Sequence, residues 1–153
     1  DIMVYLRSRE EQYRVPRDYL QGRMILPTYR KQLLDWVLQV HGRTKTLQET
    51  LFLAVHYIDK FTWLSPDLRK TDYQLVGVTG FWIAAKFEEI WPPHHKTLLK
   101  MTDNAYDARE MQAMERKMLR ALKFDLNCPL ACHFLRRASK VGTVDVLHHS
   151  MAK

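Results

Sequence analysis

The sequence has few glycines, which interrupt helices, and few cysteines, which can crosslink a chain. Of its 153 residues only five are glycine and two are cysteine, and two cysteines are too few for a disulfide framework. Hydrophobic residues make up 46% and charged residues 27%, which excludes an intrinsically disordered protein. The length allows one ordinary domain, or one domain with a fragment of another.

The given sequence shows no pattern of a membrane segment or of a cleaved N-terminal signal. No apolar run approaches the roughly 20 residues that a membrane helix needs. The first five residues resemble neither a signal peptide nor a transit peptide. The sequence therefore predicts an intracellular protein without a membrane segment.

No group of residues has the pattern of an enzyme or a metal protein. Among the Ser, Cys and His residues no arrangement converges on a catalytic centre, and we expect no catalytic residue and no cofactor. Cys128 and Cys132 would stand one turn apart on a helix, and His133, His148 and His149 would be the further ligands of a metal. Their spacing matches no recognised metal site, so small buried thiols are the better interpretation.

Positive charge exceeds negative charge, and the formal net charge is +7. Such an excess suits nucleic acid, because neutralising phosphates is the general source of affinity for it. The cations are scattered along the chain, however, and no basic cluster exceeds two residues. A solvated surface with some attraction for acidic partners is the better interpretation.

Apolar residues recur at helical spacing along nearly the whole chain, and no strand is predicted. Thr28 is the expected N-cap of the second helix, and Thr46 with Glu49 matches a capping box at the start of the third. Asp107 with Glu110 is expected to begin a later helix, and Gly142 to end another. The expected helices cover residues 1–13, 28–43, 46–61, 72–90, 94–101, 107–122, 130–140 and 144–153.

The segment 72–90 is apolar nearly all round, which places it at the centre of a helical bundle. Gly77 and Gly80 are interpreted as positions where neighbouring helices approach closely. Lys86 stands among aromatic and small apolar residues near the end of this segment. Because an unpaired buried ammonium is costly, Lys86 either extends to water or serves a groove that another molecule completes.

Several runs of the sequence, in the right order, resemble the cyclin box, most closely that of the mitotic (A/B-type) cyclins. Order and approximate spacing hold over residues 1–135. The runs include LLDWV (33–37), LAVHYIDKF (53–61), AKFEEI (85–90), MTDNAY (101–106) and LKFDL (122–126).

This resemblance implies an all-α fold: a five-helix bundle around a central helix, with an N-terminal helix and the start of a second repeat. Residues 1–24 would form the N-terminal helix and lead-in, and residues 25–127 the cyclin box. Residues 128–153 would be a linker and the first-helix stub of a second cyclin repeat.

The resemblance also implies a function: a non-enzymatic, activating subunit of a cyclin-dependent protein kinase in cell-cycle control, located in the nucleus or the cytoplasm. The subunit would bind the mobile C-helix of the kinase and hold it in the active position. Arg30 and Asp59 would form an internal ion pair. The residues implied to contact the kinase are Lys86, Glu115, Phe87, Leu119, Phe124, Ile2 and Tyr5.

The sequence departs from the family in one patch. Cyclins of this type often dock Arg-x-Leu peptides, from substrates or inhibitors, in a hydrophobic groove. Here Tyr29 and Gln32 replace aliphatic residues of that groove, Tyr73 stands where leucine is usual, and Gln39 stands where an acid usually meets the peptide's arginine. We therefore predict poor or altered Arg-x-Leu binding. The complete patch is Tyr29, Gln32, Leu33, Trp36, Gln39, Tyr73 and Gln74.

An alternative function uses the same fold as a transcription-factor repeat that binds DNA and the basal transcription machinery. That function predicts clustered Lys and Arg along one face and has no need for Lys86 with Glu115. The sequence shows the reverse, so the kinase-binding function is favoured and nucleic acid is not expected as a partner.

Overall fold

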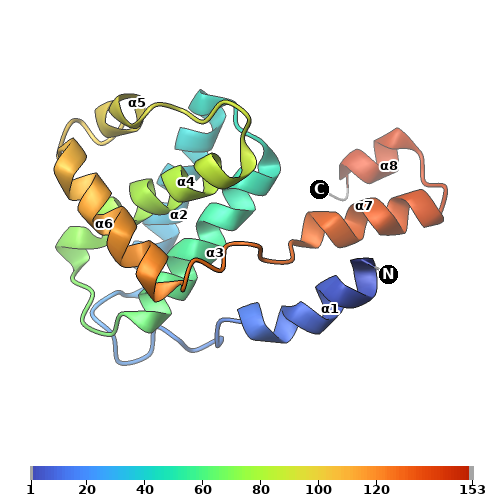
Figure 1. The fold of residues 1–153 in the computed structure, drawn as a ribbon, viewed down its shortest axis with the longest axis horizontal. Coiled ribbons are helices and arrows are strands. Elements are labelled where there is room, and N and C mark those ends of the chain that lie inside the picture. Colours follow the sequence, from blue (N-terminus) through green and yellow to red (C-terminus); the bar gives the residue numbers. More distant parts are fainter. Residues whose placement is uncertain (1, 152–153) are drawn as a thin grey trace. The chain divides into compact units, whose positions relative to one another are not determined.

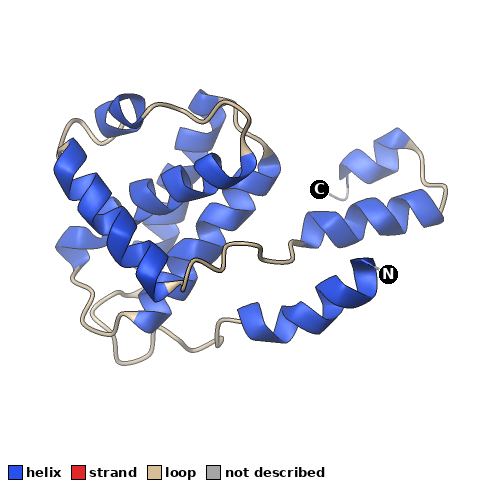
Figure 2. Cartoon of the chain, viewed as in Figure 1, coloured by secondary structure: helices blue, strands red, loops and turns tan. Residues whose placement is uncertain are grey.

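The computed structural model describes residues 2–151, and every regular element in this range is a helix (Figure 2). The elements begin and end close to the predicted positions, and the all-α prediction is confirmed. The elements are α1 (Ile2–Tyr13), α2 (Pro27–Thr44), α3 (Gln48–Leu64), the short 3-10 helix η1 (Lys70–Asp72), α4 (Tyr73–Glu88), α5 (His95–Lys100), α6 (Ala108–Ala121), α7 (Ala131–Val141) and α8 (Val146–Met151).

The described residues form two compact units. The larger unit is Val15–Leu126 and contains α2 to α6, and the smaller unit contains α1, α7 and α8. The lead-in at residues 15–24, which the sequence assigned to the N-terminal segment, clusters with the larger unit. No helix of the described range is long and apolar enough to cross a membrane.

Helix α4 forms the centre of the larger unit. Helices α2, α3, α5 and α6 all pack on it (Figure 1), as predicted from its apolar surface. A helix that is apolar on every side removes the most surface from water when other helices surround it. The buried side chains of α4 include Leu75, Val76, Val78, Phe81, Ile83 and Ala84.

Two glycines of α4 allow its neighbours to approach closely, as the sequence predicted. A Cβ atom on Gly77 would lie 2.5 Å from Cδ1 of Leu33 in α2. A Cβ atom on Gly80 would lie 2.9 Å from Cγ1 of Ile58 in α3. Both distances are shorter than carbon atoms tolerate, so α2 and α3 lie as close to α4 as they do because side chains are absent there.

We expect the substitution Gly77→Ala to lower the free energy of unfolding by about 1–3 kcal/mol, because the added methyl displaces Leu33. The matched control is Gly42→Ala in α2, where nothing lies within 4 Å of the new Cβ. There alanine should raise the free energy of unfolding by about 0.5–1 kcal/mol through its better helix propensity. Urea unfolding of both variants measures the difference, and equal stabilities would refute the close-packing role.

The starts of two helices differ from the prediction. Thr28 caps nothing: α2 begins with Pro27 at its first position and Leu26 as N-cap, without a side-chain cap. Proline suits this position because its missing N–H would be unpaired there in any case. The predicted capping box at Asp107 and Glu110 is present at the start of α6.

The predicted capping box of Thr46 and Glu49 is wrong. The N-cap of α3 is Leu47, and its backbone N–H donates at 2.6 Å to the carboxylate of Glu89, which follows α4. The hydroxyl of Thr50 donates to the same carboxylate oxygen. A carboxylate from 42 residues away thus takes the capping role, where it also faces the positive end of the α3 dipole.

Helix α7 ends at Gly142, as predicted. Cys128 precedes α7 and only Cys132 lies in it, so the two cysteines are not one helical turn apart. Both are buried, and neither takes part in a disulfide. The last predicted helix is seen as α8, and its predicted end at residues 152–153 lies outside the described residues.

Candidate functional site

Lys86, in the last turn of α4, forms an ion pair with Glu115 of α6. The Lys86 side chain is 37% exposed and that of Glu115 only 15%. The ammonium also lies 3.7 Å from the centre of the Trp82 ring, one turn earlier on α4, close enough for a cation–π contact. Lys86 is therefore a partnered lysine near the surface, which fixes the end of α4 against α6.

Three apolar residues of the implied contact set lie in α4, in α6 or directly after α6. Phe87 follows Lys86 and is exposed, and Leu119 lies one turn after Glu115 on the same side of α6 and is half-buried. Phe124 is exposed in the turn after α6, where its backbone N–H donates at 2.9 Å to the carbonyl of Leu119. The larger unit thus carries this charge pair and two exposed aromatic rings, one in the last turn of α4 and one after α6.

The two other residues implied to contact the kinase, Ile2 and Tyr5, lie in the smaller unit. Both are exposed on α1, where they are separated by about one helical turn.

The structure adds two exposed apolar residues that the sequence interpretation missed. Ile90 and Trp91 are 88% and 89% exposed in the turn after α4, the segment that Glu89 fastens to the start of α3. A tryptophan directly before Pro92 and Pro93 was the available signal, because prolines end the helix and leave the ring without a helical face to bury. These two side chains add to the exposed apolar residues at the end of α4, where Phe87 is also exposed.

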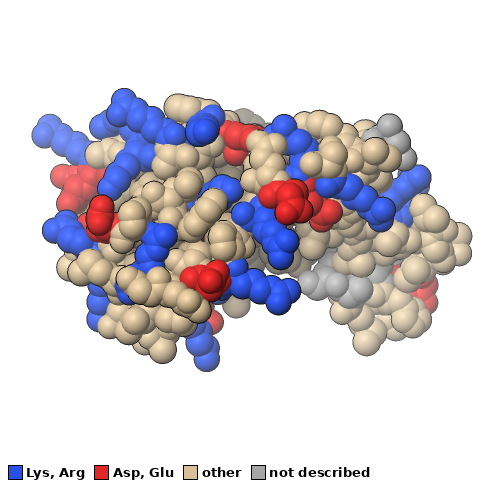
Figure 3. Space-filling model, turned by 90° about the horizontal axis from the view of Figure 1, so that it is seen from below, with Lys and Arg blue, Asp and Glu red and all other residues tan. Residues whose placement is uncertain are grey.

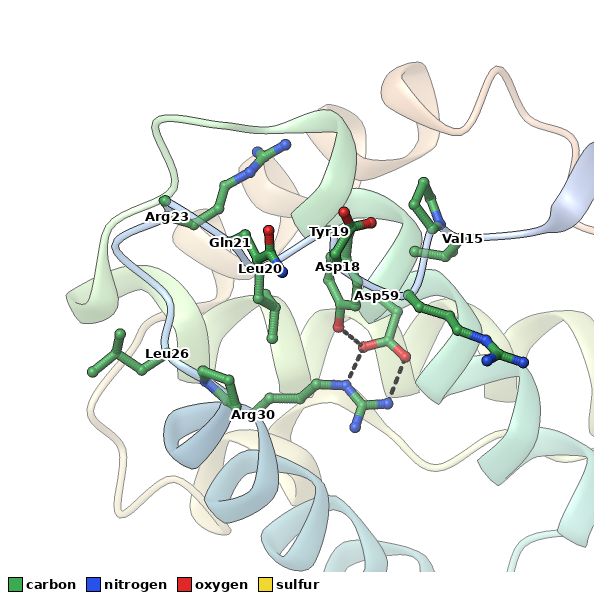
Figure 4. Close-up of a pocket in the computed structure, with 13 residues that line it drawn as sticks. Val15, Asp18, Tyr19, Leu20, Gln21, Arg23, Leu26, Arg30 and Asp59 are labelled. Atoms are coloured by element: carbon green, nitrogen blue, oxygen red, sulfur yellow. Dashed lines mark hydrogen bonds and ion pairs between the residues drawn. The ribbon is translucent and has the colours of Figure 1, made fainter.

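Arg30 of α2 and Asp59 of α3 form an ion pair with two hydrogen bonds of 2.8 Å each. The Arg30 and Asp59 side chains are 33% and 14% exposed. The hydroxyl of Tyr19, in the lead-in, donates to the same carboxylate at 2.6 Å. Figure 4 shows Tyr19 and Arg30 pointing toward Asp59 from opposite sides. The carboxylate therefore joins three separate segments of the larger unit.

Burial and hydrogen bonding in this cluster raise the pKa values of Tyr19 and Arg30. Burial, together with the hydrogen bond to Asp59, raises the pKa of Tyr19 far above its usual value. The same carboxylate raises the pKa of Arg30. The cluster is thus a carboxylate held between a cation and a neutral phenol. It lies at the wall of an open pocket of about 1090 Å³ beneath the lead-in (Figure 4).

Six of the seven residues of the predicted docking patch line one groove of about 280 Å³ between α2 and the start of α4. Gln39 is the exception and does not line it. Lys70 of η1 is a lining residue that the sequence interpretation missed, and its Nζ lies 4.1 Å from the centre of the Tyr29 ring. Leu33 and Tyr73 are buried and form the floor. The other lining residues are Tyr29, Gln32, Trp36 and Gln74.

Cations are dispersed over the face of the molecule that Figure 3 shows. On the face shown in Figure 3, Lys and Arg side chains alternate with acidic and uncharged ones and form no continuous field. Among the described residues no group of three or more His, Cys, Asp or Glu side chains is placed to hold a metal ion. The side chain of His149, one of the candidate ligands, lies outside the described residues.

Comparison with known proteins gives consistent matches. The family model "Cyclin, N-terminal domain" matches residues 1–127. The chain is 45% identical to the G2/mitotic-specific cyclin-B of Marthasterias glacialis over 153 residues, all of this chain and 39% of that protein. It is 44% identical to human G2/mitotic-specific cyclin-B2, again over its full length and 38% of the relative. The chain therefore spans less than half the length of these curated relatives.

The fold has a counterpart among solved structures. The crystal structure of a viral cyclin from herpesvirus saimiri superposes with a TM-score of 0.83 at 19% sequence identity. The superposition covers 99% of this chain and 66% of the viral protein. At this identity the likeness concerns the fold, and it agrees with the five-helix arrangement around α4.

Proposed function

The chain belongs to the cyclin family, with the N-terminal cyclin box of a mitotic B-type cyclin, and on this premise we propose that it is an activating subunit of a cyclin-dependent protein kinase. In this role it performs no chemistry of its own and needs no cofactor. It acts inside the cell, in the nucleus or the cytoplasm. The residues proposed to contact the kinase are Lys86, Glu115, Phe87, Leu119, Phe124, Ile2 and Tyr5.

The observation that carries this proposal is the ion pair of Lys86 with Glu115, which joins two helices whose ends also carry the exposed rings of Phe87 and Phe124. A lysine offers three donors and a carboxylate several acceptor sites, so each group can keep its partner and also bond backbone groups of another protein. Charge-assisted hydrogen bonds of this kind are strong and directional. The rings of Phe87 and Phe124 supply the apolar area that an interface needs at its centre.

Activation follows from selective binding. A protein kinase is active when a strand lysine pairs with a glutamate of its C-helix. A partner that binds only this arrangement shifts the kinase population toward it. Moving the ratio of active to inactive kinase from 1:99 to 99:1 takes about 5.5 kcal/mol of differential affinity.

Co-purification of the chain with a panel of cyclin-dependent kinases tests the proposal. We expect at least one kinase to bind in a 1:1 complex and its activity on a peptide substrate to rise by up to about 100-fold, which corresponds to that population shift. If the chain binds and activates no kinase of the panel, the proposal is wrong. A salt-dependent shift of duplex DNA would instead favour the transcription-factor alternative, which no observation on the described residues supports.

Residues 128–153 are proposed to begin a second cyclin repeat. The supporting observation is that α7 and α8 cluster apart from the five-helix unit.

A further inference from the structure

The groove between α2 and the start of α4 combines an apolar floor with polar walls. Leu33 and Tyr73 are buried beneath it, and Trp36 forms part of its side. Gln32 and Gln74 each supply a side-chain amide that can donate and accept hydrogen bonds. Such a lining suits an extended peptide that places one apolar side chain on the floor while its backbone bonds to the amides.

The residues that line the groove carry a positive charge and no negative charge. Lys70 is its only ionisable lining residue apart from tyrosine, and no carboxylate lines it. The nearest acid in sequence, Asp72, is engaged by Arg69 through hydrogen bonds of 3.0 and 3.3 Å. Among the described residues Lys70 has no ion-pair partner, and its ammonium lies over the Tyr29 ring at the edge of the groove.

We propose that this groove selects peptides in which an apolar residue is accompanied by a glutamate or aspartate. The apolar side chain contacts Leu33 and Tyr73, and the carboxylate pairs with Lys70. An arginine in the same place meets a like charge, and repulsion of this kind separates wrong ligands from right ones. The role of such peptides as kinase substrates or regulators rests on the proposed function, whereas their binding depends only on α2, η1 and α4.

Synthetic, fluorescently labelled ten-residue peptides test the preference by fluorescence anisotropy. In each peptide one leucine is fixed, and glutamate, glutamine or arginine is placed two residues before or after it. We expect the best glutamate peptide to bind at least about 10-fold more tightly than the matching arginine peptide at low salt. The ratio should shrink at high ionic strength, because part of the pairing is screened.

Charge reversal at Lys70 provides the decisive variant. Lys70→Glu should invert the preference, and Lys70→Gln should abolish it while keeping a side chain of similar length. The matched control is Lys31→Glu, which adds the same charge change at an exposed position of α2 that does not line the groove. This control should keep the preference of the unmodified chain.

Three outcomes would overturn the proposal: arginine peptides that bind as tightly as glutamate peptides, a ratio that Lys70 does not control, or no measurable binding of any leucine peptide. Kinase binding is measured on the same variants. Because Lys70 lies outside the proposed kinase-contacting residues, its variants should bind the kinase normally. A chain that binds no kinase but retains the peptide preference refutes only the proposed function.

Discussion

Replacing Lys86 and Glu115 together by alanine should weaken binding of the chain to its kinase about 100-fold or more. Truncating one member of a buried, hydrogen-bonded charge pair at an interface costs about 2–5 kcal/mol, and 1.4 kcal/mol corresponds to a factor of ten in Kd. Glu115 is mostly buried and Lys86 is held between Glu115 and Trp82. Both groups are therefore already oriented before the kinase arrives, so little ordering opposes binding.

Single variants separate the contribution of Lys86 and Glu115 to stability from their contribution to kinase binding. Lys86→Ala leaves the Glu115 carboxylate without its partner, so it should lower the free energy of unfolding as well as the affinity. The double variant removes both charges and should recover much of the stability while its affinity stays low. Thermal unfolding and isothermal titration calorimetry on the same samples measure the two effects.

The matched control is Lys31→Ala with Lys117→Ala. Both lysines are exposed, one on α2 and the other on the side of α6 away from Glu115. Their loss should leave kinase affinity within about twofold, since exposed surface charges contribute little and the ring that Lys117 contacts, that of Phe61 with its centre 5.9 Å from Nζ, is not among the proposed kinase-contacting residues. If the Lys86/Glu115 double variant binds as well as this control, these residues do not form the kinase-contacting site.

Asp59→Ala should lower the free energy of unfolding by about 3 kcal/mol. Removing one partner of a buried ion pair typically costs about 3–5 kcal/mol, because the other charge is left without compensation. Arg30 is one-third exposed, which places the expectation at the low end of that range. Tyr19 also loses its acceptor, and the lead-in then stays attached to α3 through hydrogen bonds from Arg23 to the carbonyls of Thr62 and Trp63.

Two further variants separate the loss of the Arg30–Asp59 ion pair from the loss of the Tyr19 hydrogen bond and from the loss of an exposed carboxylate. Tyr19→Phe removes a single hydrogen bond and should cost about 1 kcal/mol. Asp35→Ala removes an exposed carboxylate of α2 and should change stability by less than about 0.5 kcal/mol. A loss below about 1 kcal/mol for Asp59→Ala in urea unfolding would show that Arg30–Asp59 behaves as an ordinary surface pair.

Helix positions could be predicted from the sequence because their causes are local. Apolar residues at intervals of three and four define the buried side of a helix, and Asp107 with Glu110 satisfies its own helix end within one turn. The central place of α4 could also be predicted, since a helix that is apolar all round has no side suited to water. Gly77 and Gly80 were predicted as packing positions because a helix surrounded by others needs places where its neighbours approach closely.

The start of α3 was predicted wrongly because a distant group caps it. Thr46 and Glu49 have the spacing of a capping box, but Glu49 is buried and Glu89 supplies the acceptor. Local propensity compares only neighbours in sequence, whereas the lowest free energy also depends on groups that folding brings near. The exposed Ile90 and Trp91 were missed because apolar residues are assumed buried unless something prevents it.

The sequence by itself determined that this chain is helical, where its helices lie, and that it resembles the cyclin box. Only the tertiary structure decided three contacts between distant residues that the sequence did not predict: Tyr19 with Asp59, Glu89 with the start of α3, and Lys70 with Tyr29. The physical reason is the range of the interactions. Helix formation depends on hydrogen bonds and side chains within about one turn, whereas these pairs depend on how the lead-in, α2, α3 and α4 pack together.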